Sequence, residues 1–300
     1  MRGKKTKEVI PVFYKSSPQI NCLLVTALVA FNATAANSVR QLPEKGKFSI
    51  TPEVGTFINR DGKYVNGDAT TGIVGDSGFP QIGGIVVSPG LRAKAENQGF
   101  DDVFDTPLSV GLTLNYGLSS HSEVFGRLQY TQASAQKFDL LTFRTAGFIN
   151  AGPVNGNPPP IAPIPVAVGD VVRGEFDDYE EYGLDIGYRY FFKSDNRFKP
   201  FASISGGVRF VDSLKLDYIA PTGESIGKAN FYDDSTVFAM GIGVGFRYEV
   251  SPTVAFGLES GVSYQDKLDD EDLGGGGLGG LNHGGDRLQI PLYVGLNILL

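Results

Sequence analysis

The chain has 300 residues, of which 40 are glycine and none is tryptophan, and this length suits one large β domain or two small domains. Its mean hydropathy of −0.06 is too polar for a bundle of membrane-spanning helices. The formal net charge of −7, without any basic stripe, argues against a nucleic-acid-binding protein.

The N-terminal segment has the pattern of a secretory signal peptide. Five basic residues precede the apolar run Cys22–Phe31, and small residues that include an Ala-x-Ala site follow it. The run is too short to cross a bilayer as a helix, and the alternative interpretations are an N-terminal anchor or a buried helix. We predict a signal peptide at residues 1–35 and a short lead at 36–45. Cleavage after Ala35 would leave 21 basic and 32 acidic residues, a net charge of −11, and would remove the only cysteine, as suits an oxidising envelope.

Eight later segments alternate large apolar residues with small or polar ones, which is the signal of a β-strand with two different faces. Each is about long enough to cross a bilayer as a tilted strand. The segments are 48–58, 108–116, 123–131, 181–192, 201–211, 236–250, 254–265 and 288–300.

The connections between these segments alternate in length. Three are short, with the sequences GLSSHS, KSDNRFKP and SPT, and are rich in turn-forming residues. Four are long, at about 59–107, 132–180, 212–235 and 266–287. An even number of strands with short turns at one end and long loops at the other is typical of bacterial outer-membrane barrels. We therefore predict a transmembrane barrel over residues 46–300 with four long extracellular loops.

The distribution of side chains between the two strand faces supports a lipid environment. In residues 236–250, one face carries Phe238, Met240, Ile242 and Val244, and the other carries mainly glycine. A soluble β-sandwich is the alternative, but the apolar faces are long for sandwich strands and end in Tyr and Phe, as an aromatic girdle would. The predicted fold is all-β, an eight-stranded antiparallel up-and-down transmembrane β-barrel.

Several phrases resemble a known superfamily. LNYGLSSHSEVFGRLQY and KPFASISGGVRF are similar to hairpin and strand phrases of the OmpA/OmpX-type eight-stranded outer-membrane β-barrels. The last strand, YVGLNILL, resembles their C-terminal assembly signal, with Gly295, Ile298 and Leu300 in its pattern positions, although the family usually ends in an aromatic residue. The resemblance covers residues 46–300. It implies a Gram-negative outer-membrane location and recognition of the C-terminal strand by the barrel-assembly machinery.

The predicted inward faces carry four acids and four arginines. Because eight strands enclose only enough space for side chains, we expect these charges to pair and to plug the lumen. A gated polar conduit is the alternative, since glycines and serines of the fifth to seventh strands leave space on one side. The predicted network consists of Glu53, Arg127, Glu181, Asp185, Arg189, Arg209, Arg247 and Glu259.

Two prolines fall inside strands that must pair to close the barrel. Pro52 lies in the first strand and Pro291 in the last. A proline has no backbone N–H to give to a ladder, so we predict a bulge or a missing pair near one of them.

The sequence offers little for catalysis. His121 lies beside Ser and Glu in SSHSE, but adjacent residues point apart, and the other histidine, His283, is flanked by glycine. We predict no catalytic residue, no cofactor and no resident metal. Acidic side chains of the last long loop are candidate contacts for a hard cation, with a solvated acidic loop as the alternative. They are Asp266, Asp269, Asp270, Glu271 and Asp272.

The sequence thus favours a non-enzymatic surface and envelope-integrity protein. Its expected partners are outer-membrane lipid or lipopolysaccharide, the barrel-assembly machinery and an extracellular ligand, with no nucleic acid. The alternatives are a narrow conduit for small solutes or apolar compounds and a lipid-modifying enzyme.

Overall fold

The computed structural model describes residues 43–67, 81–82, 85–87, 90–151, 163–192, 197–270 and 281–300. The predicted signal peptide and most of the predicted lead lie outside these residues. No helix in the described part of the chain is long and apolar enough to cross a membrane.

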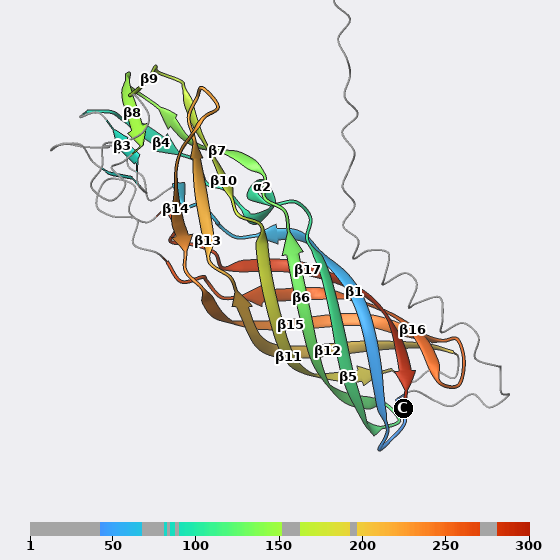
Figure 1. The fold of residues 1–300 in the computed structure, drawn as a ribbon. Helices are drawn as coiled ribbons and strands as arrows, with labels where there is room; N and C mark the ends of the chain where they lie inside the picture. The colour runs from blue at the N-terminus through green and yellow to red at the C-terminus, as the bar shows by residue number, and fades with distance from the viewer. Residues whose placement is uncertain are drawn as a thin grey trace, which may run out of the picture. The chain divides into compact units, whose positions relative to one another are not determined.

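Eight long strands form a closed barrel (Figure 1). Every neighbouring pair is antiparallel, and β1 pairs with both β5 and β17, which closes the sheet on itself. All eight predicted strands are confirmed, and each boundary lies within three residues of its predicted position. The barrel strands are β1 (Phe48–Asp61), β5 (Leu108–Ser119), β6 (Ser122–Ala133), β11 (Tyr179–Phe191), β12 (Phe198–Val211), β15 (Ser235–Glu249), β16 (Val254–Gln265) and β17 (Arg287–Leu299).

The barrel is apolar on its outside. Among the described residues, all the exposed large apolar side chains except Val168 lie on barrel strands or directly beside them. Ile186 and Ile242, near the middles of β11 and β15, are 71% and 64% exposed. In water such a belt would be costly, whereas in a bilayer it contacts hydrocarbon. A closed barrel also satisfies every backbone polar group of its strands within lipid. The predicted lipid-facing column on β15 is therefore confirmed.

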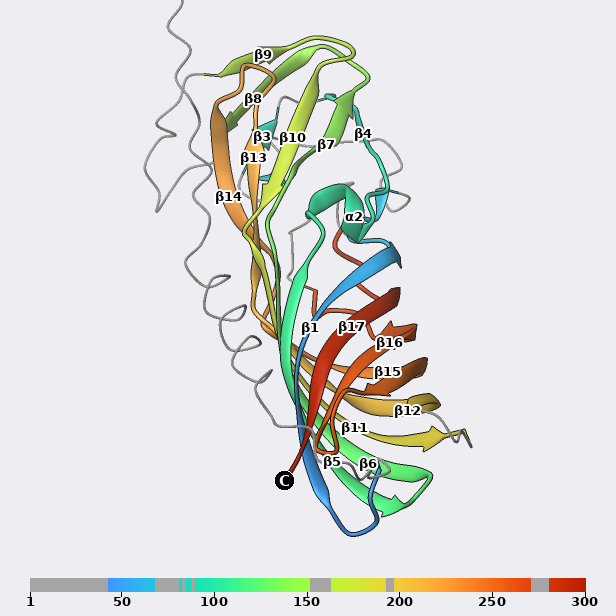
Figure 2. The same ribbon diagram turned by 90° about the vertical axis from the view of Figure 1, so that its right-hand side faces the viewer.

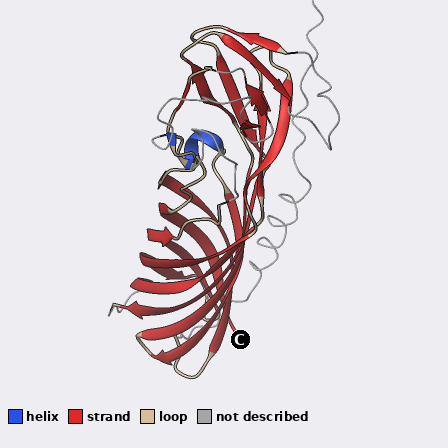
Figure 3. Ribbon diagram, turned by 90° about the vertical axis from the view of Figure 1, so that its left-hand side faces the viewer, coloured by secondary structure: helices blue, strands red, loops and turns tan. Residues whose placement is uncertain are grey.

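The connections predicted as long loops contain further secondary structure that the sequence analysis did not predict. Two additional sheets and the short helix α2 (Phe100–Val103) belong to them, and Figures 2 and 3 show these elements beyond one end of the barrel strands. The five-stranded sheet has the order β14 (Ser225–Tyr232), β13 (Leu214–Ile219), β10 (Val171–Phe176), β7 (Lys137–Phe143) and β4 (Ala93–Ala95). The four-stranded sheet has the order β2 (Gln81–Ile82), β3 (Ile85–Val87), β8 (Gly147–Ala151) and β9 (Ile164–Val166).

These additional elements share an ordinary hydrophobic core. In β7, Phe138 and Leu140 are buried, while Lys137 and Asp139, which alternate with them, are exposed. The core continues into the adjoining ends of the barrel strands, where Tyr179 is buried. Apolar side chains thus face outward around the barrel and inward in the sheets beyond it. We call the sheets, α2 and their shared core the cap.

Both mid-strand prolines interrupt the ladders of β17. The β1–β17 pairs pass from Ile50↔Ile298 to Glu53↔Gly295, so that Thr51 and Pro52 are omitted. The β16–β17 pairs omit the two residues of β16 opposite Ile290 and Pro291. There the Ser260 hydroxyl donates to the Pro291 carbonyl at 2.8 Å. The predicted loss of ladder pairing is confirmed at both prolines, because each lacks the N–H that a rung needs.

Candidate functional site in the barrel interior

The candidate site is the set of charged side chains inside the barrel. Successive residues of a strand point to opposite faces, so every second residue of each barrel strand enters the lumen. The structure places all eight predicted lumen residues there. Seven are buried, and the side chain of Glu259 is 14% exposed.

Glu259 is a hub of the interior. Its Oε2 atom accepts from Arg127 Nη2 at 2.9 Å and from Arg189 Nη2 at 2.8 Å, and its Oε1 atom accepts from the Ser203 hydroxyl at 2.6 Å. Arg127 also contacts Glu53, with 2.6 Å between Nε and Oε1. One carboxylate on β16 thus ties together β6, β11 and β12 across the lumen.

The same chain of charges continues to a carboxylate that the sequence analysis missed. Glu123 pairs with Arg189 and accepts two bonds from Arg247, at 2.6 and 2.7 Å. The amide oxygen of Asn115 accepts from both of these arginines. Glu123 shares the inward parity of Arg127, so extending the predicted strand's pattern to its first residue would have found it.

A second chain of charges lies nearer the cap. Arg209 contacts both Asp185 oxygens, at 2.8 and 3.0 Å, and approaches Glu181 at 3.4 Å. Glu181 also accepts from Arg287 Nη2 at 3.0 Å. Arg287, likewise missed, lies one residue before the predicted start of the last strand, on its inward face.

Each chain of ion pairs is electrically balanced. The first contains three carboxylates and three guanidinium groups, and the second contains two of each. A buried charge is tolerated when it is both paired and hydrogen-bonded, so this balance lets charged side chains fill a narrow lumen. The arginine fork suits the task because it bonds two acceptors at once.

Aromatic rings cover the guanidinium faces. Arg189 lies over the rings of Phe125 and Phe201, each at 4.6 Å from its Cζ atom to the ring centroid. Arg127 lies over Tyr293 at 4.4 Å. These contacts add cation–π attraction and occupy space that the glycines leave open.

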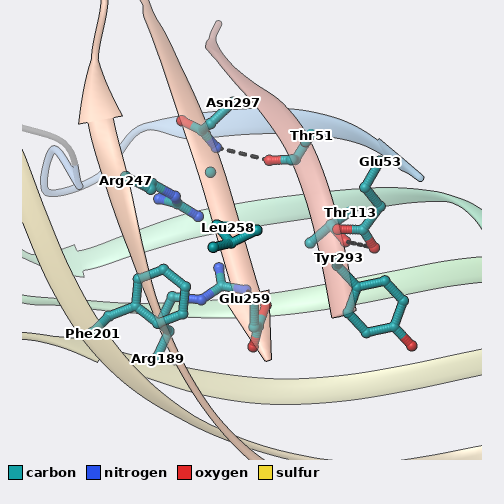
Figure 4. A pocket seen from close by; sticks show the side chains of 12 residues that line it. Thr51, Glu53, Thr113, Arg189, Phe201, Arg247, Leu258, Glu259, Tyr293 and Asn297 are labelled. Carbon is teal, nitrogen blue, oxygen red and sulfur yellow. Dashed lines mark hydrogen bonds and ion pairs between the residues drawn. The ribbon is translucent and has the colours of Figure 1, made fainter. Parts of the chain in front are cut away.

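The space that remains is small. Two cavities have volumes of about 30 and 40 Å³. Figure 4 shows the first, lined among others by Glu53, Arg189, Arg247 and Asn297. Glu259 and Tyr293 border both cavities. Such volumes hold a few water molecules, because one water needs about 10–15 Å³ measured in this way.

Two of the three inward glycines of β15 have little free space beside them. A Cβ atom added at Gly245 would lie 2.5 Å from the Phe201 ring, and one at Gly243 would lie 2.6 Å from the Ser203 hydroxyl. Only at Gly241 would it meet ordinary contacts, at 3.4 Å or more. Side chains of β12 therefore occupy most of the room beside this column.

The end of the lumen nearest the cap is filled around Arg287. Its guanidinium lies over the rings of Phe100 and Tyr179, at 5.0 and 4.9 Å, and over Tyr64 at 5.9 Å. It also donates to the Tyr179 hydroxyl at 2.5 Å. Phe100 and Tyr64 belong to the connection between β1 and β5, so this buried cation joins the cap to the lumen.

The predicted loop acids are only partly described. Asp266, Asp269 and Asp270 are exposed, whereas Glu271 and Asp272 lie outside the described residues. Asp270 Oδ2 lies 3.6 Å from His283 Nε2, and partial burial raises the pKa of the Asp270 carboxyl. The described residues contain no group of three or more His, Cys, Asp or Glu side chains that could hold a metal ion.

The SSHSE segment does not assemble a triad. The Ser120 hydroxyl and His121 Nδ1 are 2.8 Å apart at the β5–β6 turn. Glu123, however, points into the lumen and is bound by Arg189 and Arg247. The acid that would have to orient the histidine therefore faces away from it.

Comparison with known proteins gives a likeness of fold only. No protein-family model matches the chain, and no curated protein matches it. A structure of the attachment invasion locus protein Ail of Yersinia pestis is 14% identical, with a TM-score of 0.34, and the match covers 86% of this chain and 100% of that one. Neisserial surface protein A is 12% identical, with a TM-score of 0.36, and the match covers 84% of this chain and 96% of that one. OprG from Pseudomonas aeruginosa is 11% identical, with a TM-score of 0.37, and the match covers 87% of this chain and 99% of that one.

At TM-scores this low, the likeness says nothing about function. The architecture of the chain is instead evident from its own strand order, registers and surface. Eight antiparallel strands close into a barrel whose outer face is apolar. An antiparallel barrel with short turns, long opposite connections and a lipid-facing belt is the architecture of outer-membrane proteins. The chain is an eight-stranded antiparallel β-barrel with a lipid-facing outer surface, the architecture that is typical of proteins of the bacterial outer membrane.

Proposed function

We propose that the protein is a non-enzymatic surface protein of the outer membrane, whose lumen is closed and whose cap supports envelope integrity through external contacts. The observation that carries this proposal is the filled interior: two balanced chains of ion pairs leave cavities of only about 30 and 40 Å³. If the lumen has no continuous path, the cap is the part of the protein that can act on the surroundings.

The exposed face of the five-stranded sheet supports this role. It carries cross-strand ion pairs between Lys137 and Glu175 at 3.6 Å and between Arg173 and Asp139 at 3.4 Å. This face is charged and is supported by its own core, so it can meet a polar partner without unfolding. Lipopolysaccharide headgroups, cations and an external macromolecule are the proposed partners. We also propose that the barrel-assembly machinery recognises β17.

Conductance is the direct test. We expect the purified protein to be silent in planar lipid bilayers at voltages at which an open porin conducts. The second candidate function, a narrow conduit, is favoured by the two cavities in the lumen, both of which Glu259 and Tyr293 border. Single-channel steps that change in size in Arg127→Ala or Glu259→Ala would establish the conduit and refute the closed lumen.

The role of the cap needs a cellular test. In the source bacterium, loss of the protein should increase sensitivity to detergent and EDTA, and the wild-type chain should restore resistance. A chain with the β13–β14 hairpin shortened should reach the outer membrane but fail to restore resistance. Its matched control is Val168→Thr, which changes one exposed apolar residue of the described cap. Full restoration by the shortened chain would refute a role for this hairpin, and hydrolysis of lipids by the purified protein would refute the non-enzymatic proposal.

A further inference from the structure

β17 has interrupted backbone pairing on both of its sides. The β1–β17 ladder omits Thr51 and Pro52, and the β16–β17 ladder omits the two residues opposite Ile290 and Pro291. The other six barrel ladders have no omission in mid-strand. Since a barrel is held together by its ladders, β17 is the strand with the least continuous backbone support.

Lumen-facing side chains of β17 reach other strands. Asn297 Nδ2 donates to Ser49 Oγ at 2.8 Å and to Thr51 Oγ1 at 2.9 Å, both on β1. Farther along β17, the Tyr293 hydroxyl donates to Gln129 on β6 at 3.2 Å, and Arg287 binds Glu181 on β11. β17 is thus bound to its neighbour β1 through Asn297, and to strands across the lumen through Tyr293 and Arg287.

The Asn297 contact falls at the omitted rung. The flanking pairs Ile50↔Ile298 and Glu53↔Gly295 place Thr51 opposite Asn297. Figure 4 shows the Asn297–Thr51 bond bridging these two strands. A side-chain hydrogen bond therefore joins the two residues whose backbone pair is missing beside Pro52.

The same two hydroxyls are also held from the opposite side. Asn115 Nδ2 of β5 donates to Ser49 Oγ at 3.3 Å and to Thr51 Oγ1 at 3.1 Å. Asn115 and Asn297 are each only 1% exposed, and Ser49 and Thr51 are buried. Buried hydrogen bonds of this kind face little competition from water, so breaking them leaves polar groups unsatisfied.

We propose that the β1–β17 seam is where this barrel opens first, and that Asn297 with Ser49 and Thr51 forms an internal latch that keeps it closed. The latch replaces the backbone rung that Pro52 removes. It goes beyond the proposed surface function, because it concerns how the barrel closes and not what the cap contacts.

The test compares latch variants with disulfides that lock one seam or another, all in a Cys22→Ser background. Asn297→Ala, refolded into detergent micelles, should lose its fast-migrating folded gel band at a temperature roughly 5 °C below the parent, as expected for the loss of two buried hydrogen bonds. Thr51→Val, which removes at nearly constant volume the hydroxyl that accepts from both Asn297 and Asn115, should also lower this temperature.

A seam disulfide identifies where opening begins. Val54→Cys with Val294→Cys joins paired residues of β1 and β17, and Leu184→Cys with Val208→Cys joins paired residues of β11 and β12. Added to Asn297→Ala, the first pair should restore the parent's temperature until it is reduced, and the second should not. If Asn297→Ala does not fold, the same comparison is made on refolding yield. A parent-like temperature in Asn297→Ala, or equal rescue by both disulfides, would overturn the latch.

Discussion

At the scale of single residues, the interior depends on carboxylates that each serve more than one arginine. Glu259 accepts from Arg127, Arg189 and Ser203, and Glu123 is shared by Arg189 and Arg247. Removing one such acid leaves two buried cations partly unpaired. The cost is larger than the net value of the pair itself, because it includes the desolvation of charges that remain buried.

Glu259→Gln should therefore lower the free energy of unfolding by about 3 kcal/mol. The chain has no tryptophan, so unfolding in urea is best followed by far-ultraviolet circular dichroism in micelles. The matched control is Glu175→Gln, whose exposed carboxylate lies 3.6 Å from Lys137 and should contribute less than about 1 kcal/mol. Equal effects of the two substitutions would contradict the hub role of Glu259.

At the scale of the elements, each barrel strand has one face adapted to lipid and one adapted to the lumen. In β15, Met240, Ile242 and Val244 are exposed, whereas Ala239 is buried. Two-residue periodicity lets a single strand satisfy both environments. The same periodicity serves the opposite purpose in β7, where apolar side chains enter the core of the cap.

The lipid face should respond to charge according to depth. Ile242→Arg, at the middle of β15, should lower the free energy of folding into bilayers by roughly 2–4 kcal/mol, because the guanidinium would enter the hydrocarbon. Thr236→Arg, on the same face near the cap end of the strand, should cost only about 0–1 kcal/mol. Urea titrations of both variants in phospholipid vesicles measure the difference. Similar costs at the two positions would argue against a lipid-facing β15.

At the scale of the whole molecule, the chain combines a barrel that is apolar outside with a cap that is apolar inside. The ends of the barrel strands nearest the cap mark the change between them, and there Tyr179 is buried in the core of the cap. From this arrangement we predict that the cap is extracellular and that the short turns, such as the one between β15 and β16, are periplasmic.

Surface labelling tests this orientation. In a Cys22→Ser background, Ser225→Cys on β14 should react with a membrane-impermeant maleimide on intact cells. Thr253→Cys, in the β15–β16 turn, should react only after the outer membrane is permeabilised. Both positions are exposed in the structure, so accessibility within the protein does not limit either reaction. Labelling of Thr253→Cys on intact cells would reverse the assigned topology.

The sequence by itself determined the eight barrel strands, the faces that they turn to lipid and lumen, and most of the charged residues of the interior. These properties follow from two-residue periodicity, which is local to each strand and was strong wherever a strand was long enough to span a bilayer. The sequence pattern did not assign Glu123 and Arg287 to the interior because each lies at the start of a strand. There the alternation can be followed only toward the C-terminal side.

Only the tertiary structure decided which charges pair and how the cap is built. Glu259 binds Arg127 and Arg189 because barrel closure brings β6 and β11 across the lumen from β16, and no spacing in the sequence records that distance. The five-stranded sheet joins strands from three different connections, with β7 between β4 and β10. Short strands bury too little surface alone to be stable, so their pairing depends on the partners that the barrel places beside them.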